Sequence, residues 1–240
     1  MIGANVSAFS VGKAVGRGAV VPKSWQYTGD NFAVAGDTAD ILYKTDDDTI
    51  WTVGSSSRKA YKYTSSGVYT GTNFSVSDVG STTQSITWDG THFWVLSYSG
   101  KKVGKYTAAG SYTGDYFSVS TRTTPVGVAW DGTYFWITDS SNNKVYRYTA
   151  GGSYDSFNFN TSSQITKLKD IVYDGSDLWA IDRDAGGVYK YTTGGSYTGE
   201  SFSILAQGTG FTGIAYTGSD FWTCNQSEDK AFKYALLPTP

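Results

Sequence analysis

The sequence predicts an all-β fold built from five copies of one four-stranded unit. A tryptophan recurs five times at intervals of 42 or 43 residues, and a tyrosine follows each copy twelve positions later. The tryptophans are Trp51, Trp94, Trp136, Trp179 and Trp222, and the tyrosines are Tyr63, Tyr106, Tyr148, Tyr191 and Tyr234. Because two landmarks keep one register through five copies, the repeat is not a chance match of a short motif.

The third copy shows the four strands of the unit most clearly. Apolar and polar residues alternate within four short runs, which are separated by turn residues such as Asp131-Gly132 and Gly151-Gly152. The runs cover residues 126–130, 134–138, 144–148 and 153–159. Alternation with period two between such turns is typical of antiparallel strands. A sheet of this size cannot bury both of its faces alone, so the copies must stack on one another.

The fourth strand of the unit predicts how the array of copies closes. Its signature is a tyrosine with a phenylalanine five positions later, and it follows each of the first four units. The fifth example stands before the first unit, as Tyr27 and Phe32. A repeat of about 40–45 residues with four strands is typical of a β-propeller, and a displaced strand closes its ring. A solenoid, the alternative, has no reason to displace a strand.

We therefore expect two parts in the chain. Residues 23–240 should form a five-bladed β-propeller of four-stranded antiparallel blades, in which the N-terminal strand closes the last blade. Residues 1–22 should form an arm outside the repeat.

The composition excludes several kinds of partner and reaction. Nineteen basic and 21 acidic residues leave a net charge of −2, so neither nucleic acid nor an acidic membrane surface is an expected partner. Cys224 is the single cysteine, which rules out an intramolecular disulfide. His92, the single histidine, belongs to the second unit and Cys224 to the fifth, so a nucleophilic Cys–His pair is not expected.

Acidic residues in two kinds of turn are expected to be structural. The run Asp46-Asp47-Asp48 replaces the first hairpin turn of its unit. A solvated loop is favoured there over a calcium site, because no further oxygen ligands accompany the run at a suitable spacing. Asp139 and Asp182 follow unit tryptophans by three positions, where a short polar side chain caps the next turn. We expect neither a metal nor a cofactor.

The arm is expected to be a contact segment. It lacks the charged start and the uninterrupted apolar run of a secretory signal, and it is too short and too polar to span a membrane. A frayed tail is one interpretation. Its apolar residues favour the other, an extended arm that docks on a partner protein. The residues expected to make this contact are Ile2, Val6, Phe9, Val11 and Val15.

The third unit also resembles the repeat of a known family. It begins Pro-Val-Gly-Val-Ala-Trp-Asp at Pro125 and continues Asp-Ser-Ser-Asn at Asp139, which is similar to the NHL-type propeller repeat. The fourth unit matches less well, and the first two units lack the Asp-Ser-x-Asn stretch. NHL propellers usually have six blades, whereas the lectin-like tachylectin propeller has five. The resemblance implies the fold and leaves the activity open.

Binding is expected on one face of the propeller, which we call the variable-loop face. It carries two sets of loops that differ from unit to unit, whereas the turns on the opposite face repeat as Asp-Gly-Thr and Gly-Ser-Tyr-Thr-Gly. Varied loops on a rigid scaffold are where binding usually resides. Loops from fourth to first strands cover 36–40, 78–85, 121–125, 160–170 and 206–212, and loops from second to third strands cover 55–59, 97–101, 140–144, 182–187 and 225–230. The candidate contacts are Arg58, Tyr98, Lys101, Arg122, Asn142, Asn143, Arg183, Asp184 and Glu228.

These observations favour a non-enzymatic interaction or structural protein. A propeller hydrolase would need acidic residues that recur on the first strands around the central channel, and none is expected there. A free glycan-binding, lectin-like propeller is the main alternative, because exposed aromatic, hydroxyl and amide groups suit sugars. A surface rich in Gly, Ser, Thr and Tyr without an export signal is similar to bacteriophage capsid-decoration and tail proteins. We expect an exposed virion component that binds other virion proteins through the arm, with glycan or host-surface binding as an added role; a cytoplasmic location is the alternative.

Overall fold

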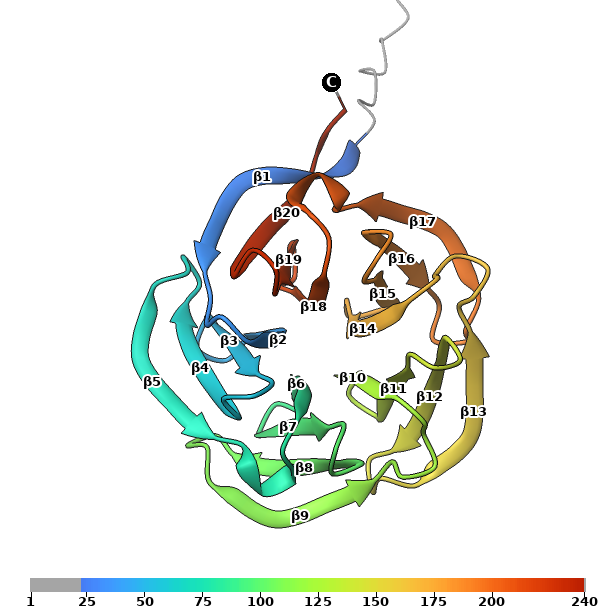
Figure 1. Cartoon of the computed structure of the whole chain (residues 1–240). Coiled ribbons are helices and arrows are strands. Elements are labelled where there is room, and N and C mark those ends of the chain that lie inside the picture. The colour runs from blue at the N-terminus through green and yellow to red at the C-terminus, as the bar shows by residue number, and fades with distance from the viewer. Residues whose placement is uncertain (1–22, 240) are drawn as a thin grey trace, which may run out of the picture.

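The computed structural model describes residues 23–239 and confirms the five-bladed β-propeller. In that range, twenty strands form five antiparallel four-stranded sheets, which are arranged as blades around one axis (Figure 1). The strands β2, β6, β10, β14 and β18 are innermost, and β5, β9, β13, β17 and β1 form the circumference. Two short 3₁₀ turns, η1 (Ser77–Val79) and η2 (Leu205–Gln207), follow outer strands.

The blades have nearly the same strand lengths. Blade 1 contains β2 (Thr38–Lys44), β3 (Thr49–Gly54), β4 (Lys59–Thr64) and β5 (Tyr69–Ser75). Blade 2 contains β6 (Thr83–Trp88), β7 (His92–Ser97), β8 (Lys102–Thr107) and β9 (Tyr112–Ser118). Blade 3 contains β10 (Pro125–Trp130), β11 (Tyr134–Asp139), β12 (Lys144–Thr149) and β13 (Tyr154–Asn160). Blade 4 contains β14 (Leu168–Tyr173), β15 (Leu178–Asp182), β16 (Gly187–Tyr191) and β17 (Tyr197–Ser203). Blade 5 contains β18 (Phe211–Tyr216), β19 (Asp220–Asn225), β20 (Lys230–Pro238) and β1 (Lys23–Ala33).

One aspartate fixes the first hairpin of blade 3 and its tryptophan together. Oδ1 of Asp131 accepts hydrogen bonds from the backbone N–H groups of Thr133 at 2.8 Å and Tyr134 at 2.7 Å. Oδ2 accepts the indole N–H of Trp136 at 2.7 Å. Asp89 in blade 2 and Asp174 in blade 4 make the same contacts. The repeated Asp-Gly turn is therefore kept because it both shapes the hairpin and satisfies a buried indole donor.

The tryptophans also join neighbouring blades. Trp94 of blade 2 lies 4.9 Å from the ring of Phe135 in blade 3, and Trp179 of blade 4 lies 5.0 Å from Phe221 in blade 5. Both pairs have the edge-to-face geometry that aromatic rings favour. Trp136 instead packs in one buried cluster with Leu178 of blade 4. Each blade thus covers the apolar face that its neighbour cannot bury alone.

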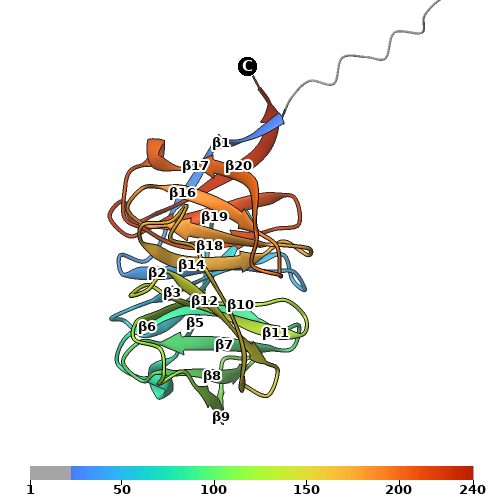
Figure 2. The same ribbon diagram turned by 90° about the vertical axis from the view of Figure 1, so that its right-hand side faces the viewer.

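The N-terminal strand closes the ring, as the sequence predicts. β1 pairs with β20 in an antiparallel register that runs from Lys23 opposite Pro238 to Ala33 opposite Lys230. Trp25 of β1 contacts the ring of Trp179 in the preceding blade at 6.0 Å. The outer ends of β1 and β20 leave the disc together as a two-stranded ribbon (Figure 2).

The arm residues Ile2, Val6, Phe9, Val11 and Val15 lie outside the described residues, so the expected docking role stays a prediction. Within residues 23–239, no helix has the length and apolarity needed to cross a membrane.

Trp136→Ala tests whether the tryptophan between blades 3 and 4 stabilises the fold. The side chain is 0% exposed, so its removal leaves a cavity and an unpaired Asp131 oxygen. We expect the free energy of unfolding to fall by about 3–5 kcal/mol in urea denaturation. Tyr116→Ala, at an aromatic that is 58% exposed on β9, is the control and should cost about 0.5 kcal/mol. Equal losses in the two variants would contradict this account of the blade interface.

Candidate functional site

Five equivalent positions on the innermost strands surround the propeller axis. They are occupied by Asp40, Ser85, Gly127, Asp170 and Gly213, one on each inner strand. An innermost strand has a neighbour on one side only, so the backbone N–H groups on its free edge need acceptors from elsewhere. The N–H groups in question belong to the next residues along the chain, Ile41, Ile86, Val128, Ile171 and Ile214.

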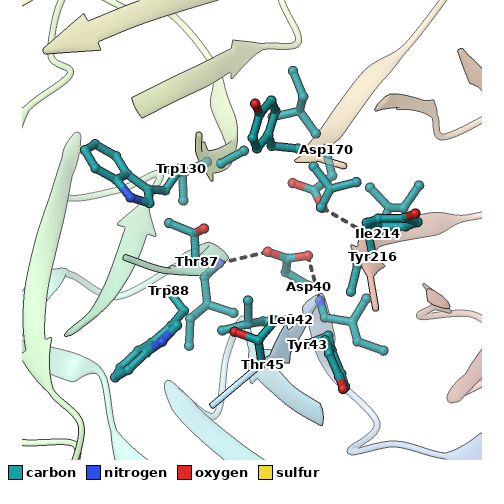
Figure 3. A pocket seen from close by; sticks show the side chains of 18 residues that line it. Asp40, Leu42, Tyr43, Thr45, Thr87, Trp88, Trp130, Asp170, Ile214 and Tyr216 are labelled. Atoms are coloured by element: carbon teal, nitrogen blue, oxygen red, sulfur yellow. Dashed lines mark hydrogen bonds between the residues drawn. The ribbon is translucent and has the colours of Figure 1, made fainter. Parts of the chain in front are cut away.

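An aspartate and a serine satisfy three of these N–H groups. Figure 3 shows the two hydrogen bonds that Asp40 accepts. Asp40 accepts from Ile41 N at 2.6 Å through Oδ1 and from Ile86 N at 2.8 Å through Oδ2. The Ser85 hydroxyl accepts from Val128 N at 2.9 Å and donates to Asp40 Oδ2 at 2.7 Å. Blades 1, 2 and 3 are thereby joined at the axis.

A second aspartate satisfies a fourth N–H group. Asp170 accepts from Ile214 N at 2.9 Å through Oδ2. Its Oδ1 lies 3.4 Å from the Ser85 hydroxyl, on the opposite side of the axis. We call Asp40, Ser85 and Asp170 the central polar cluster. Its side chains give acceptors to the inward N–H groups of Ile41, Ile86, Val128 and Ile214.

Two glycines make room for this cluster. A Cβ atom on Gly127 would lie 2.7 Å from Asp170 Oδ1, and one on Gly213 would lie 2.3 Å from Asp40 Oδ1. Both distances are too short for real contacts, so a side chain at either position would displace an aspartate. The five residues around the axis therefore depend on one another, because the two glycines leave the space that the two aspartate carboxyl groups occupy.

Both carboxyl groups of the cluster have raised pKa values. Burial raises the pKa of Asp40 well above its ordinary value, and the nearby charge of Asp170 raises it further. Burial also raises the pKa of Asp170, to about 6, although hydrogen bonds to its carboxyl group oppose this shift. Burial thus favours the neutral form of each carboxyl group.

The cluster corrects the expectation that no acidic residue recurs on the first strands. From the sequence pattern, Asp40 and Asp170 fall at the ends of loops 36–40 and 160–170. β2 and β14 begin two residues earlier, at Thr38 and Leu168, so both aspartates lie inside innermost strands at equivalent positions. The recurrence is difficult to recognise in the sequence because the other three blades place Ser or Gly there.

A pocket of about 190 Å³ lies over the central polar cluster on the side of the Asp-Gly turns (Figure 3). Asp40 and Asp170 lie at its base. One aromatic residue from each blade lines it: Tyr43, Trp88, Trp130, Tyr173 and Tyr216. We call it the hairpin-face pocket. None of the nine candidate contacts lines it, and the carboxyl oxygens at its base already accept backbone N–H groups.

The nine candidate contacts lie in the loops of the variable-loop face, and the structure brings some of them together. Lys101 Nζ lies 4.3 Å above the ring of Tyr98, a residue that is 40% exposed. The Arg122 guanidinium lies 3.9 Å above the ring of Tyr146, whose hydroxyl accepts a hydrogen bond from Asn142 at 2.8 Å. These four residues form two local groups, in blades 2 and 3. Their role in binding stays a prediction.

The other candidate contacts are separate from these groups. Asn143 is a structural residue: its amide donates to Thr166 O at 3.1 Å and accepts from Leu168 N at 3.0 Å, which ties blade 3 to blade 4. The remaining candidates, which are exposed and lie in blades 1, 4 and 5, are Arg58, Arg183, Asp184 and Glu228.

A second pocket, of about 250 Å³, opens on the variable-loop face where blades 2, 3 and 4 meet. We call it the variable-face pocket. Tyr98 and Arg183 line it, together with Gln84, Lys167 and Lys169, which are not among the nine candidate contacts. The feature of the sequence that points to this pocket is Lys169, a lysine within an innermost strand. Ala39, Gln84, Val126 and Thr212 hold the equivalent positions in the other blades.

The residues considered for catalysis or metal binding do not converge. The His92 ring lies 3.8 Å from the Asp89 carboxylate, while Cys224 is buried in β19 beside the Thr212 hydroxyl at 3.3 Å. Burial raises the pKa of the Cys224 thiol. Asp46, Asp47 and Asp48 bind Lys44, Lys62 and Ser65 as members of a hairpin loop. Within residues 23–239, no group of three or more His, Cys, Asp or Glu side chains is placed to hold a metal ion.

Comparison with known proteins supports the fold. No protein-family model matches the chain, and no curated protein sequence matches it. Among solved structures, Myxococcus xanthus glutaminyl cyclase is 8% identical, with a TM-score of 0.69 over 92% of this chain and 99% of that one. Virginiamycin B lyase from Staphylococcus aureus is 21% identical, with a TM-score of 0.53 over 83% of this chain. This chain covers 66% of that lyase, just under two thirds of its length.

A luciferin-regenerating enzyme is 13% identical, with a TM-score of 0.57 over 89% of this chain and 95% of that one. At such low identity these likenesses establish the propeller fold alone. The NHL-type resemblance of the third unit agrees with that fold, and the family name stays a prediction.

Asp170→Asn tests the raised pKa of Asp170 in the central polar cluster. The folded carboxyl keeps a proton that the unfolded one, with an ordinary pKa of 3.8, has released, so this group stabilises the fold less as the pH rises through about 6. We expect the variant to reduce the loss of unfolding free energy between pH 4 and pH 7 by on the order of 2 kcal/mol, measured by urea denaturation across that range.

Asp182→Asn is the control, because the pKa of Asp182 is shifted in the opposite direction from that of Asp170. Burial alone would raise the pKa of Asp182, but hydrogen bonds from Ala185 and Thr166 lower it overall, so its stabilisation is lost on acidification below about pH 4. If the wild type and Asp170→Asn show the same slope of stability against pH, the pKa of Asp170 is not raised in the folded protein.

Proposed function

We propose that this propeller is a non-enzymatic binding protein that contacts glycans or a host surface through its variable-loop face. The observation that carries the proposal is the way in which this face is held rigid. In every blade, a side chain in a loop or at the loop end of the second strand bonds to a neighbouring loop. The residues that make these bonds are Asp37, Ser99, Asp139, Asp182 and Asn225.

Blade 3 shows how such a bond works. Asp139, at the end of β11, accepts from Thr123 N at 2.8 Å and from Thr124 N at 3.0 Å in the preceding loop. It also accepts from Ser141 N at 3.0 Å in its own turn. One buried carboxylate thus fixes two loops against each other. A surface fixed in this way loses little conformational entropy when a ligand binds.

The chemistry displayed by these fixed loops suits sugars. Tyr98 presents an exposed ring with a hydroxyl group, Asn142 an amide, and Arg122 a guanidinium held over Tyr146. Aromatic surface with a polar handle, surrounded by hydrogen-bonding groups, matches the apolar faces and hydroxyl groups of a saccharide.

The paired carboxyl groups argue against hydrolase chemistry. A general acid or base must reach the substrate, but Asp40 and Asp170 both bond to backbone N–H groups at the axis. Several similar structures are named as enzymes, yet an identity of 21% or less transfers no activity to this chain. We therefore assign the pair a structural role.

Tyr98→Ala tests the binding face. We expect the variant to lose about tenfold or more in affinity for a glycan that the wild type selects from an array, because stacking area and a hydroxyl partner are removed together. Tyr116→Ala, at the other exposed tyrosine used above, should bind like the wild type. Equal binding by wild type and Tyr98→Ala would place the contact elsewhere, and no glycan binding by the wild type would refute the glycan role.

The second part of the proposal is that the protein is carried on a larger particle, such as a virion, and docks through the arm and its surroundings. The two-stranded ribbon of β1 and β20, which projects from blade 5, supports a contact with a partner protein (Figure 2). Leu236 and Leu237 on β20 are 44% and 37% exposed, opposite Trp25 and Ser24 of β1. Two adjacent exposed leucines on a projecting ribbon are suited to burial against a protein partner.

Sedimentation of native source material tests the assembly. We expect the chain to travel with a large particle at fixed copy number, as measured by mass spectrometry of gradient fractions. A variant with Leu236→Ser and Leu237→Ser should shift to the monomer position, because the exposed apolar contact is lost. Migration of the wild type as a free monomer would refute particle assembly and leave the free lectin-like propeller as the alternative.

A further inference from the structure

The variable-face pocket collects hydrogen-bond donors from three blades. Lys169 Nζ reaches across the axis from blade 4 and donates to Gln84 Oε1 of blade 2 at 2.7 Å. The lysine is only 6% exposed, and the rest of its ammonium hydrogens remain for another acceptor. Since Gln84 uses its oxygen for this bond, its amide nitrogen is the group left to donate. Lys167 and Arg183 are exposed and line the same pocket.

The positive charge of this pocket is not balanced by carboxylates. Within the described part of the chain, Lys167, Lys169 and Arg183 take part in none of the ion pairs, which involve other lysines, Arg147 and His92. No acidic residue lines the pocket. A ligand would therefore meet three cationic side chains that lack an anionic partner.

The acidic residues nearby are engaged elsewhere. Asp182, at the end of β15, accepts four hydrogen bonds from loop donors. Asp40 and Asp170 belong to the central polar cluster. Burial lowers the pKa of Lys169, and the nearby charge of Asp170 opposes this shift without reversing it. An anion placed against Lys169 would stabilise its charged form.

We propose that the variable-face pocket binds the acid group of an acidic sugar, either a carboxylate or a sulfate. Lys169 would contact the anion at the base of the pocket, and Lys167 and Arg183 at the rim. This inference rests on the proposed glycan-binding function and names the class of glycan.

A sugar acid fits the lining better than a small inorganic anion. Thr124, Ser140 and Tyr98 contribute hydroxyl groups and an aromatic ring to the same cavity of about 250 Å³. A ligand with one acid group beside several hydroxyl groups would engage the charged and the neutral parts of the lining together. Charged hydrogen bonds of this kind are shorter and stronger than neutral ones.

A glycan array with matched neutral, carboxylated and sulfated versions of the same backbones tests the inference on the full chain. We expect carboxylated or sulfated members to bind and their neutral counterparts not to bind, with affinity that falls as salt rises. The two acidic sets show which anion the pocket prefers.

Paired substitutions locate the site. For the best acidic glycan, titration calorimetry should show that Lys167→Gln with Arg183→Gln weakens binding about tenfold or more. Lys59→Gln with Lys230→Gln is the matched control: it removes two exposed charges from the ends of other strands near the same face and should change affinity less than about twofold. Both pairs are exposed, and circular dichroism checks that each variant is folded.

The outcomes separate the two proposals. If neutral glycans bind as tightly as their acidic counterparts, the acidic-sugar inference fails while the glycan-binding function stands. Equal affinity of an acidic glycan for the wild type and the Lys167/Arg183 variant also overturns the pocket assignment. If no glycan on the array binds, both proposals fail.

Discussion

The need to satisfy backbone donors at the centre of the ring constrains the rest of this structure. Five innermost strands bring their unpaired edges to one axis, and a buried N–H group without an acceptor is costly. Asp40, Ser85 and Asp170 supply acceptors for the N–H groups of four of these strands. The glycines at 127 and 213, the raised pKa values of the two carboxyl groups and the closed base of the hairpin-face pocket are consequences of this arrangement.

Further from the axis, single polar side chains again satisfy several hydrogen-bond donors at once. Asp131 shapes a hairpin and accepts the indole N–H of Trp136, which frees that ring to pack between blades. At the loop end of the same strand, Asp139 joins two loops. The β10–β11 pair is therefore fixed by one carboxylate at each of its ends. Side chains at the ends of the blade strands hold the loops of the variable-loop face in place. The other side chains of these loops can therefore differ without altering the fold.

Much of the fold could be predicted from the sequence because its determinants are local and repeated. The tryptophan, the tyrosine twelve positions later and the Asp-Gly turn all lie within one unit, and the displaced N-terminal strand gave the closure of the ring. The central polar cluster could not be predicted in this way, because each blade contributes a different residue and the contacts cross from blade to blade. Lys169 and Gln84 are 85 positions apart and meet only when the ring has closed. For the same reason, Asn143 could not be recognised as a structural residue from its loop position alone.

The pairing of β1 with β20 also determines how the molecule responds to force. Lys23 lies opposite Pro238, so the two ends of the described chain leave blade 5 at the same point and in nearly the same direction (Figure 2). Tension applied between these ends would open the β1–β20 hydrogen bonds one after another, starting at the Lys23 end, instead of loading them all at once. The other four blades have no chain end in their sheets. Blade 5 is therefore the point at which a mechanically loaded ring would open first, although it is built from the same repeat as its neighbours.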